Sequence, residues 1–514
     1  MNTLRICGVG VYESEEFYDY AAEKGILIWQ DLMFSCTLYP MDDEFIENVK
    51  TEVRQQIWRL RKHTSILTFN ANNENELAIR KHWYKADNYT EKQQVSDYVA
   101  LYVNVISPIV KKLLDSSHPF LLSSPSNGIE TVIEGGIAQN PGDTRFGDIH
   151  FYNDQLNLWQ DSTYLTPRCA TEYGVQSLPL NFTMLKWINE KDYSYMSPTF
   201  ENRQHGTGQT ISNLALIFSH LPIPSSCANY TRENITKCTA INSTEFLNRF
   251  SYLSQINHAI TLKVQTEHYR RFRNQTNEVG EGNTMCAMYW QLNDVWAAPT
   301  PSSIDFELKW KATHYEARRF FDQLIVALFA RGHNLGVTIV NDEVNEIKGA
   351  KLVVNLYAWS KGFDPLSSII QFVDIPALSA KTFYFERFAF ALNDKKSDYL
   401  FEAYVEDEQG RRLTQRNYLY PDKFYEVDLG RLGNVAIESA EGSSDGLSYI
   451  IKLSSTGLSP FTWIDIGIPY LGWLSDNSFT MTTPTKTVKL HLVKPLKLSK
   501  DDFTICNMKN CGLN

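Results

Sequence analysis

The sequence lacks any apolar run long enough to cross a membrane, although 43% of its 514 residues are hydrophobic. A membrane-spanning helix needs about 18 or more consecutive apolar residues, and no stretch reaches that length. Basic residues are not in excess either, because 49 Lys and Arg stand against 59 Asp and Glu, for a net charge of −10. We therefore expect neither a membrane nor a nucleic acid as partner.

Cysteine is also scarce, with eight residues in the whole chain, so disulfide bonds do not define the fold. Four cysteines lie in apolar, strand-like settings and are predicted to be buried thiols: Cys7, Cys36, Cys169 and Cys286. Two further pairs could each be bridged, Cys227 with Cys238 and Cys506 with Cys511. No pair has the Cys-x-x-Cys or Cys/His spacing of a zinc site, so we expect no metal.

The N-terminus has no apolar segment of the kind found in signal peptides. Six Asn-x-Ser/Thr triplets nevertheless occur, at Asn88, Asn181, Asn229, Asn234, Asn242 and Asn274. Three of them lie in the polar loop around Cys227 and Cys238, which suggests a glycosylated surface insertion and a secretory route. Together these features lead us to expect that the natural N-terminus is missing from this sequence.

Up to about residue 325, strand-like runs alternate with helical patterns, which is typical of parallel βα units. Strands are predicted near residues 4–7, 26–31, 65–72, 119–124, 146–151, 168–172 and 286–291. Helices are predicted at 15–24, 43–62 and 245–273, among others. Seven strands are one fewer than a closed (β/α)8 barrel needs. Alternating runs at 351–359 and 487–492 then predict antiparallel strands. About 190 residues with this alternating pattern fit two β-sandwiches.

Two glutamates each end an apolar run and are the best candidates for catalysis. Glu74 follows 65–73, Glu172 follows 167–171, and 172 − 74 = 98 residues separate them. Carboxylates at the ends of parallel strands can converge on one pocket, and a converging carboxyl pair is what cleavage of a glycosidic bond requires. Taken alone, each glutamate is more often a solvated strand end. Asn72 and Asn73 favour a site, because they bring amide donors and acceptors to the same strand end.

Several motifs carry a resemblance to a known family. They are Gly8-x-Gly10-x-Tyr12-Glu13, Trp29-Gln30-Asp31-x-Met33-Phe34-x-Cys36, Asn72-Asn73-Glu74-Asn75-Glu76, Ser123-Ser124-Pro125-Ser126-Asn127-Gly128, Gly147-Asp148-x-His150-Phe151-Tyr152, Glu172-Tyr173-Gly174 and Tyr289-Trp290-Gln291-Leu292-Asn293-Asp294. In this order and at this spacing, the chain resembles glycoside hydrolase family 2, and within it the β-mannosidases of the lysosomal type.

The resemblance implies a (β/α)8 TIM barrel at residues 1–325, followed by immunoglobulin-like β-sandwich domains at 326–420 and 421–514. It also implies two further N-terminal domains and a first barrel strand, which this sequence does not contain. The activity implied is that of a retaining exo-β-mannosidase, acting on β-mannoside oligosaccharides in the lysosome with no cofactor and no metal. The oligomeric state stays open.

The resemblance also assigns roles to residues. Glu74 is expected to be the general acid/base, with a raised pKa, and Glu172 the nucleophile. Further substrate-binding roles are expected for Asn73, at the sugar 2-hydroxyl, Trp290, beneath the ring, His150 and Tyr152, near the nucleophile or sugar hydroxyls, and Asp31, Asn293 and Asp294, at other hydroxyls. Each has a structural alternative: Trp290 could be core, His150 a structural hydrogen-bonding residue, and Asp31 or Asp294 a helix cap.

The sequence departs from the family pattern at some positions, and two alternative functions stay open. Cys7 stands where the β-mannosidases usually place a tryptophan, and Phe69-Asn70-Ala71 replaces their Trp-Ser-Gly. A β-galactosidase or β-glucuronidase of the same family is the nearest alternative enzyme. A non-catalytic remnant that only binds sugar is the alternative from another class.

Overall fold

The chain divides into two units that are each built from several segments. The computed structural model describes residues 1–85, 88–115, 117–154, 157–195, 197–204, 209–231 and 233–512. The first unit comprises Met1–Phe151, Leu165–Tyr173 and Phe272–Tyr289. The second unit comprises Tyr152–Tyr164, Gly174–Arg271 and Trp290–Asn514.

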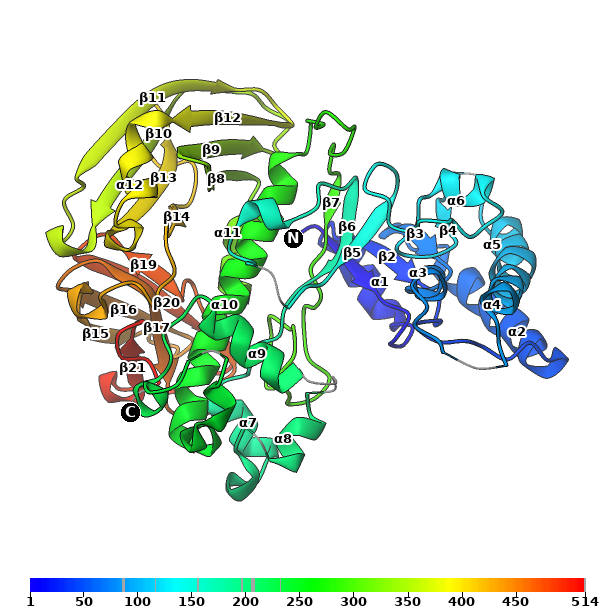
Figure 1. The fold of residues 1–514 in the computed structure, drawn as a ribbon, viewed down its shortest axis with the longest axis horizontal. Coiled ribbons are helices and arrows are strands. Elements are labelled where there is room, and N and C mark those ends of the chain that lie inside the picture. Colours follow the sequence, from blue (N-terminus) through cyan, green and yellow to red (C-terminus); the bar gives the residue numbers. More distant parts are fainter. Residues whose placement is uncertain are drawn as a thin grey trace. The chain divides into compact units, whose positions relative to one another are not determined.

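Parallel strands form the centre of the first unit (Figure 1). They are β1 (Thr3–Ile6), β2 (Leu27–Asp31), β3 (Ile66–Asn70), β4 (Phe120–Leu121), β5 (Asp148–Phe151), β6 (Cys169–Tyr173) and β7 (Cys286–Ala287). They pair in chain order as β1-β2-β3-β4 and β5-β6-β7, and every pairing is parallel. The amide of Asp148 donates to the carbonyl of Ser126 at 3.0 Å, which ties β5 to the segment after β4. All seven predicted strands are thus confirmed, although β4 and β7 contain only two residues each.

Helices separate these strands, as the apolar periodicity predicts. Their bounds are α1 (Glu15–Glu23), α2 (Asp43–Leu60), α3 (Asn75–Arg80), α4 (Glu91–Tyr98), a π-helical stretch Val99–Ile106, α5 (Ser107–Leu113) and α6 (Ile129–Ile133). The side chain of Asp42 caps α2 by accepting a hydrogen bond from the Phe45 amide at 2.9 Å. One face of α2 is buried, at Val49, Val53, Ile57 and Leu60. This spacing of three or four residues is what an amphipathic helix requires.

The second unit contains a long central helix. The helices are α7 (Asn181–Trp187), α8 (Pro198–Asn202), α9 (Gln209–Phe218), α10 (Thr244–Arg271), α11 (Ala312–Phe320) and the short α12 (Ala389–Asn393). Helix α10 is buried on nearly all sides, including polar positions. A helix that neighbours enclose all round has no solvent-facing stripe, which explains why its sequence shows little amphipathic pattern.

Two antiparallel β-sandwiches complete the second unit, and this confirms the expected all-β C-terminal region. The first pairs sheets β11-β10-β13-β14 and β12-β9-β8, and the second pairs β15-β16-β20-β18 and β19-β17-β21. The strands are β8 (Leu324–Arg331), β9 (Asn334–Asn341), β10 (Ile347–Ala358), β11 (Ser367–Ile375), β12 (Ser379–Phe385), β13 (Tyr399–Glu406), β14 (Asn417–Leu419), β15 (Val435–Gly442), β16 (Ser448–Ser455), β17 (Ser459–Ile466), β18 (Gly472–Leu474), β19 (Phe479–Met481), β20 (Thr485–Leu492) and β21 (Phe503–Cys506). The domain boundaries expected at 325 and 420 stay predictions.

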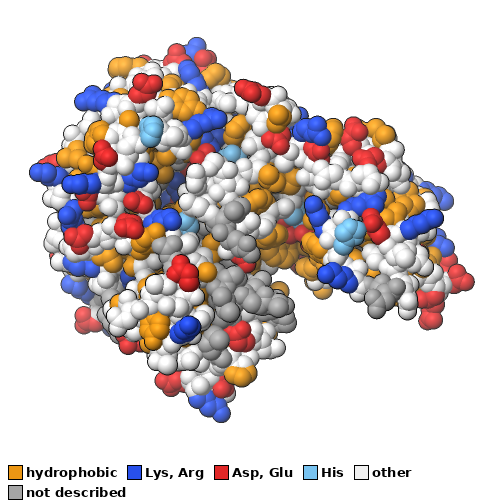
Figure 2. All heavy atoms as spheres, in the orientation of Figure 1, with side chains coloured by type: hydrophobic (Ala, Val, Ile, Leu, Met, Phe, Trp, Pro, Cys, Tyr) orange, Lys and Arg blue, Asp and Glu red, His pale blue; other side chains and the backbone are white. Residues whose placement is uncertain are grey.

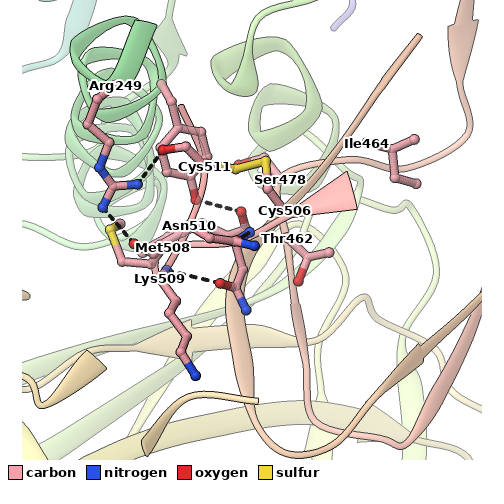
Figure 3. The surroundings of a disulfide bond; sticks show 12 residues. Arg249, Thr462, Ile464, Ser478, Cys506, Met508, Lys509, Asn510 and Cys511 are labelled. Carbon is pink, nitrogen blue, oxygen red and sulfur yellow. Dashed lines mark hydrogen bonds between the residues drawn. A yellow bond between two sulfur atoms is a disulfide. The ribbon is translucent and has the colours of Figure 1, made fainter. Parts of the chain in front are cut away.

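The C-terminal disulfide loop is attached to α10 by one arginine (Figure 3). Cys506 and Cys511 are bridged. Arg249 of α10 donates to the carbonyl of Cys511 at 2.5 Å and to that of Met508 at 2.7 Å. The guanidinium is buried, so these carbonyls replace the water that it loses on folding.

The cysteines are arranged partly as expected. Cys227 and Cys238 are bridged, as are Cys506 and Cys511, so both suggested pairs form. The expectation for Cys169 and Cys286 was wrong, because they form a third disulfide. These two residues are register partners on the adjacent parallel strands β6 and β7, with Cα atoms 4.7 Å apart. That separation lies within the range a disulfide needs. Cys7 is a buried free thiol as expected, whereas Cys36 is free but exposed.

The surface carries charges of both signs. On the face in Figure 2, Lys and Arg side chains are interspersed with Asp and Glu over the described part of the chain. Among the described residues, no helix is both long enough and apolar enough to span a membrane.

Candidate active site

The site forms where strands β1, β2, β3, β5 and β6 of the first unit end. Glu74 follows β3 and precedes α3 in a left-handed conformation, with φ at 62°. Its amide donates to the carbonyl of Ser124 at 2.8 Å, which fixes the backbone at this point. Glu172 belongs to β6 and is the register partner of His150 on β5. The strands therefore deliver both carboxylates to one place, as the sequence predicts.

The two carboxylates lie close together on either side of His150. One ligand atom each of Glu74, His150 and Glu172 lies within 4.8 Å of the others. His150 Nδ1 is 2.7 Å from Glu74 Oε1 and 3.5 Å from Glu172 Oε2. Carboxyl pairs that cleave glycosides with retention are about 5–5.5 Å apart, whereas inverting pairs are about 6.5–9.5 Å apart. One oxygen of Glu74 and one of Glu172 lie within 4.8 Å of each other, which is closer than the spacing of inverting pairs.

Arg5 of β1 contacts four of the predicted site residues, and its Nη1 lies 3.4 Å from His150 Nε2. Its guanidinium donates to Glu172 Oε1 at 2.7 Å, to Asp31 Oδ2 at 2.7 Å and to Asn73 Oδ1 at 2.8 Å. The Arg5 side chain is 5% exposed. Burial alone would lower the pKa of Arg5, but the carboxylates of Asp31 and Glu172 outweigh it and raise that pKa. Arg5 is thus a permanent positive charge that fixes one oxygen of the expected nucleophile.

Asp31 and Asn73 support this arginine. The Asp31 carboxylate is fully buried and also accepts from Asn70 Nδ2 at 2.9 Å and from the Gly8 amide at 3.2 Å. Gly8 permits this approach, because a Cβ there would come within 2.5 Å of the Phe34 carbonyl oxygen. These donors and Arg5 together engage both oxygens of the Asp31 carboxylate.

A second set of hydrogen bonds holds His150. Its Nε2 is 3.2 Å from Ser124 Oγ, and this hydroxyl donates to Asp148 Oδ2 at 2.5 Å. Thr171 Oγ1 donates to the same carboxylate oxygen at 2.6 Å. The His150 side chain is 1% exposed. These contacts fix the plane of the imidazole between the two glutamates.

The electrostatics of Glu74 and His150 are those of an ion pair. Burial alone would lower the pKa of His150, but Glu172 and Glu74 outweigh burial and raise it. Burial would raise the pKa of Glu74, but the hydrogen bond and charge of His150, the Cys36 thiol and Arg5 together lower it. We expected a raised pKa for Glu74, and this was wrong for the unliganded site. The expectation counted burial and the second carboxylate but not these donors.

Two cysteines border the carboxylates. Cys7 Sγ lies 4.0 Å from Glu172 Oε1, at the position where the family pattern has an indole. Cys36 Sγ lies 3.1 Å from Glu74 Oε2. The site therefore has a thiol near each carboxylate.

The other predicted site residues belong to the second unit. Tyr152 is exposed, Trp290 is half-buried and Asn293 is exposed. Asp294 is buried, and its two oxygens accept from Thr300 Oγ1 at 2.5 Å and Ser302 Oγ at 2.7 Å. The roles expected for these four residues stay predictions.

A metal ion could also be considered at Glu74, His150 and Glu172, since they offer one nitrogen and two carboxylate oxygens. His150 is already engaged with Glu74, and Arg5 already supplies a positive charge to Glu172 at 2.7 Å. These interactions satisfy the carboxylates without a further cation.

Arg5 and Cys36 contact the two glutamates but were not assigned to the site by sequence reasoning. One feature of the sequence could have indicated Arg5: it is a charged residue inside the apolar strand Leu4–Cys7, between Leu4 and Ile6. An inward charge on a buried strand requires partners, and such partners are found at functional sites. Cys36 had no signal beyond its place in the Trp29–Cys36 motif.

Comparison with known proteins agrees with the fold. Residues 333–424 match the Mannosidase Ig/CBM-like domain, and residues 432–511 match the Ig-fold domain Ig_mannosidase. The crystal structure of β-D-mannosidase from Dictyoglomus thermophilum superposes with a TM-score of 0.76 at 24% identity, covering 98% of this chain and 56% of that one. The crystal structure of an exo-chitosanase from Amycolatopsis orientalis superposes with a TM-score of 0.65 at 15% identity, covering 99% of this chain and 59% of that one. The fold is thus that of glycosidases built from a TIM barrel and immunoglobulin-like domains.

The sequence relatives are named as β-mannosidases. A probable β-mannosidase from Caenorhabditis elegans is 48% identical over 514 residues, covering 99% of this chain and 57% of the relative. The β-mannosidase of Capra hircus is 36% identical, covering 97% of this chain and 55% of the relative. The chain is therefore a homologue of the β-mannosidases along its whole length. It spans a little more than half the length of these relatives.

Proposed function

We propose that the protein is a retaining exo-β-mannosidase that removes terminal β-linked mannose from the non-reducing end of oligosaccharides. The observation that carries this proposal is the pair Glu74 and Glu172, within 4.8 Å of each other around His150. The whole-length homology to the β-mannosidases supports the choice of sugar. No cofactor enters the proposed reaction.

In the first step, a Glu172 carboxylate oxygen bonds to the anomeric carbon while the bond to the leaving oxygen breaks. The leaving oxygen takes the proton of Glu74. Water then gives a proton back to Glu74, its oxygen bonds to the anomeric carbon, and Glu172 is released as a carboxylate. Arg5 holds one Glu172 oxygen at 2.7 Å, which restricts rotation of the nucleophile.

Protonation of Glu74 depends on its pair with His150. His150 Nδ1 and Glu74 Oε1 lie only 2.7 Å apart, so the protonation of each group depends on that of the other. A bound sugar excludes water and favours the neutral form of both groups, which places the proton on Glu74. The lowered pKa of Glu74 in the free site predicts activity that falls as pH rises above the weakly acidic range.

We propose substrate contacts for Asn73, His150, Tyr152, Trp290, Asn293 and Asp294, and a positioning role for Asp31 through Arg5. Asn73 donates to Ser35 Oγ at 3.1 Å in the free site. A sugar 2-hydroxyl would replace or share this contact.

We also propose that the protein works in the lysosome. Three disulfides are present among the described residues, and they persist in oxidising compartments of the secretory route. The Asn-x-Ser/Thr triplets of the loop around Cys227 agree with this location.

The test is hydrolysis of nitrophenyl β-mannoside, β-galactoside and β-glucuronide by the chain, with Glu172→Gln as the inactive control. The proposal expects turnover of the mannoside in preference to the other two. Preference for another sugar would favour a different family 2 glycosidase. Binding of mannose without any turnover would favour a non-catalytic remnant that only binds sugar.

A further inference from the structure

Cys36 is brought to the acid/base by the backbone that follows β2. Its amide donates to the carbonyl of Asn73 at 3.0 Å, and Ser35 forms a parallel bridge with Asn73. Cys36 has a φ of 46°, a left-handed conformation that a side chain other than glycine rarely adopts. Such a conformation is maintained only where the surroundings fix it. The result is a thiol that faces Glu74.

The hydrogen bonds around the sulfur have a defined direction. Cys36 Sγ is 3.1 Å from Glu74 Oε2, and an ionised carboxylate can only accept, so the thiol donates. Asn73 Nδ2 and Ser35 Oγ each lie 3.4 Å from the sulfur and donate to it. Asn73 Nδ2 also donates to Ser35 Oγ. The thiol thus has its proton directed to Glu74 and its lone pairs occupied.

We propose that Cys36 is a positioning residue that holds Glu74 Oε2 by donating its thiol proton, so that Oε1 stays turned to His150. The two oxygens of the acid/base would then have separate partners, Cys36 on one side and His150 on the other. The effect on catalysis rests on the function proposed above. The hydrogen bond itself does not, and it can be tested without turnover.

The thiol is a donor rather than a nucleophile. Burial and the negative charge of Glu74 raise the pKa of Cys36 to about 12, and Glu172 adds to the increase, while the Ser35 hydroxyl opposes it. At neutral pH the thiol therefore keeps its proton. Reactivity follows the thiolate, so Cys36 should react slowly with electrophiles although it is exposed.

The charged and titratable groups that act on Glu74 come from several elements. They are His150 of β5, Arg5 of β1, Glu172 of β6, Cys36 after β2 and the phenol of Tyr84 after α3. Among these, Cys36 is the donor to Oε2. Removing it leaves the His150 contact and isolates the contribution of the thiol.

The first experiment measures alkylation of Cys36 by iodoacetamide, using mass spectrometry of the 514-residue chain between pH 7 and 9. We expect labelling about 100-fold slower than that of an unperturbed thiol. Glu74→Gln removes the negative charge and should accelerate labelling about tenfold or more. Cys7, which is buried and free, is the internal control and should stay unlabelled in both proteins. Labelling at the ordinary rate, unchanged by Glu74→Gln, would overturn the proposal.

The second experiment measures the pH dependence of kcat/KM for an unactivated β-mannoside. Donation to the ionised carboxylate lowers the pKa of Glu74, so Cys36→Ala should move the alkaline limb upward by about half to one pH unit. Cys36→Ser keeps a donor and should leave the limb close to its original position. A general loss of activity in both variants with an unmoved limb would mean that Cys36 only packs. If no β-mannoside is turned over at all, the function proposal fails while the alkylation result still decides the role of the thiol.

Discussion

Replacing Arg5 by methionine should destabilise the first unit strongly. Arg5 is 5% exposed and contacts two carboxylates, Asp31 and Glu172, which are 0% and 7% exposed. Methionine fills a similar volume but offers no donor. The substitution therefore leaves two buried negative charges without their shared partner.

The expected cost follows from these contacts. Removing one partner of a buried ion pair costs about 3–5 kcal/mol, because the remaining charge stays buried. Asp31 keeps Asn70 and the Gly8 amide as donors, which limits its share of the penalty. We therefore expect the free energy of unfolding to fall by about 3–5 kcal/mol at neutral pH. The loss should shrink at acid pH, where protonation removes the uncompensated charge.

Urea unfolding of Arg5→Met, measured by fluorescence at neutral and acid pH, tests this expectation. Adding Asp31→Asn to Arg5→Met removes one buried charge and should restore part of the loss. Arg145→Met is the matched control, since the Arg145 side chain that pairs with Asp143 is 54% exposed, and it should leave the stability nearly unchanged. A loss below about 1 kcal/mol for Arg5→Met would refute the reasoning, because surface ion pairs already reach that value.

Three further predictions address the acid/base, a buried carboxyl and the unexpected disulfide. Glu74→Ala should spare the first step with an activated aryl mannoside while natural substrates turn over poorly, and azide should restore turnover with a β-mannosyl azide as product; an α-azide would contradict the role. Burial raises the pKa of Glu76 to about 8, so its stabilising effect is complete below about pH 4.5 and is lost as pH rises toward 8. The Tm of Glu76→Gln, compared with that of the original chain, should therefore increase as the pH rises from 5 to 8. A Tm difference that does not change with pH would argue against a neutral carboxyl. Cys286→Ser should cost about 2–4 kcal/mol of unfolding free energy, since the bridge to Cys169 closes a loop of 117 residues; an unchanged urea midpoint would show that this bridge does not form.

The sequence predicted the strand order well because apolar runs and turn residues alternate clearly up to about residue 325. Strands β2 and β3 were found almost to the residue, since a buried parallel strand is apolar on both faces. Strand β7 was predicted at 286–291 but ends at Ala287. An apolar run continues there through Met288, Tyr289 and Trp290, and composition alone does not show where strand pairing stops.

The sequence predicted the two carboxylates of the site but not the groups that surround them. Glu74 and Glu172 could be found because each ends a strand. Arg5 could not be assigned, because its partners come from distant segments that only the fold brings together. The direction of the Glu74 pKa shift was missed for the same reason. The disulfide between Cys169 and Cys286 depends on the register of two parallel strands, which no local pattern specifies.

The most direct test of the account is trapping of the glycosyl-enzyme. A 2-deoxy-2-fluoro mannoside with a good leaving group should inactivate the protein, and peptide mass spectrometry should find the fluoromannosyl group on Glu172. Glu172→Gln should stay unlabelled under the same conditions, while Cys286→Ser, if folded, should still be labelled. A label on any other carboxylate, or none on a folded protein that turns over β-mannosides, would contradict the assignment of Glu172 as the nucleophile.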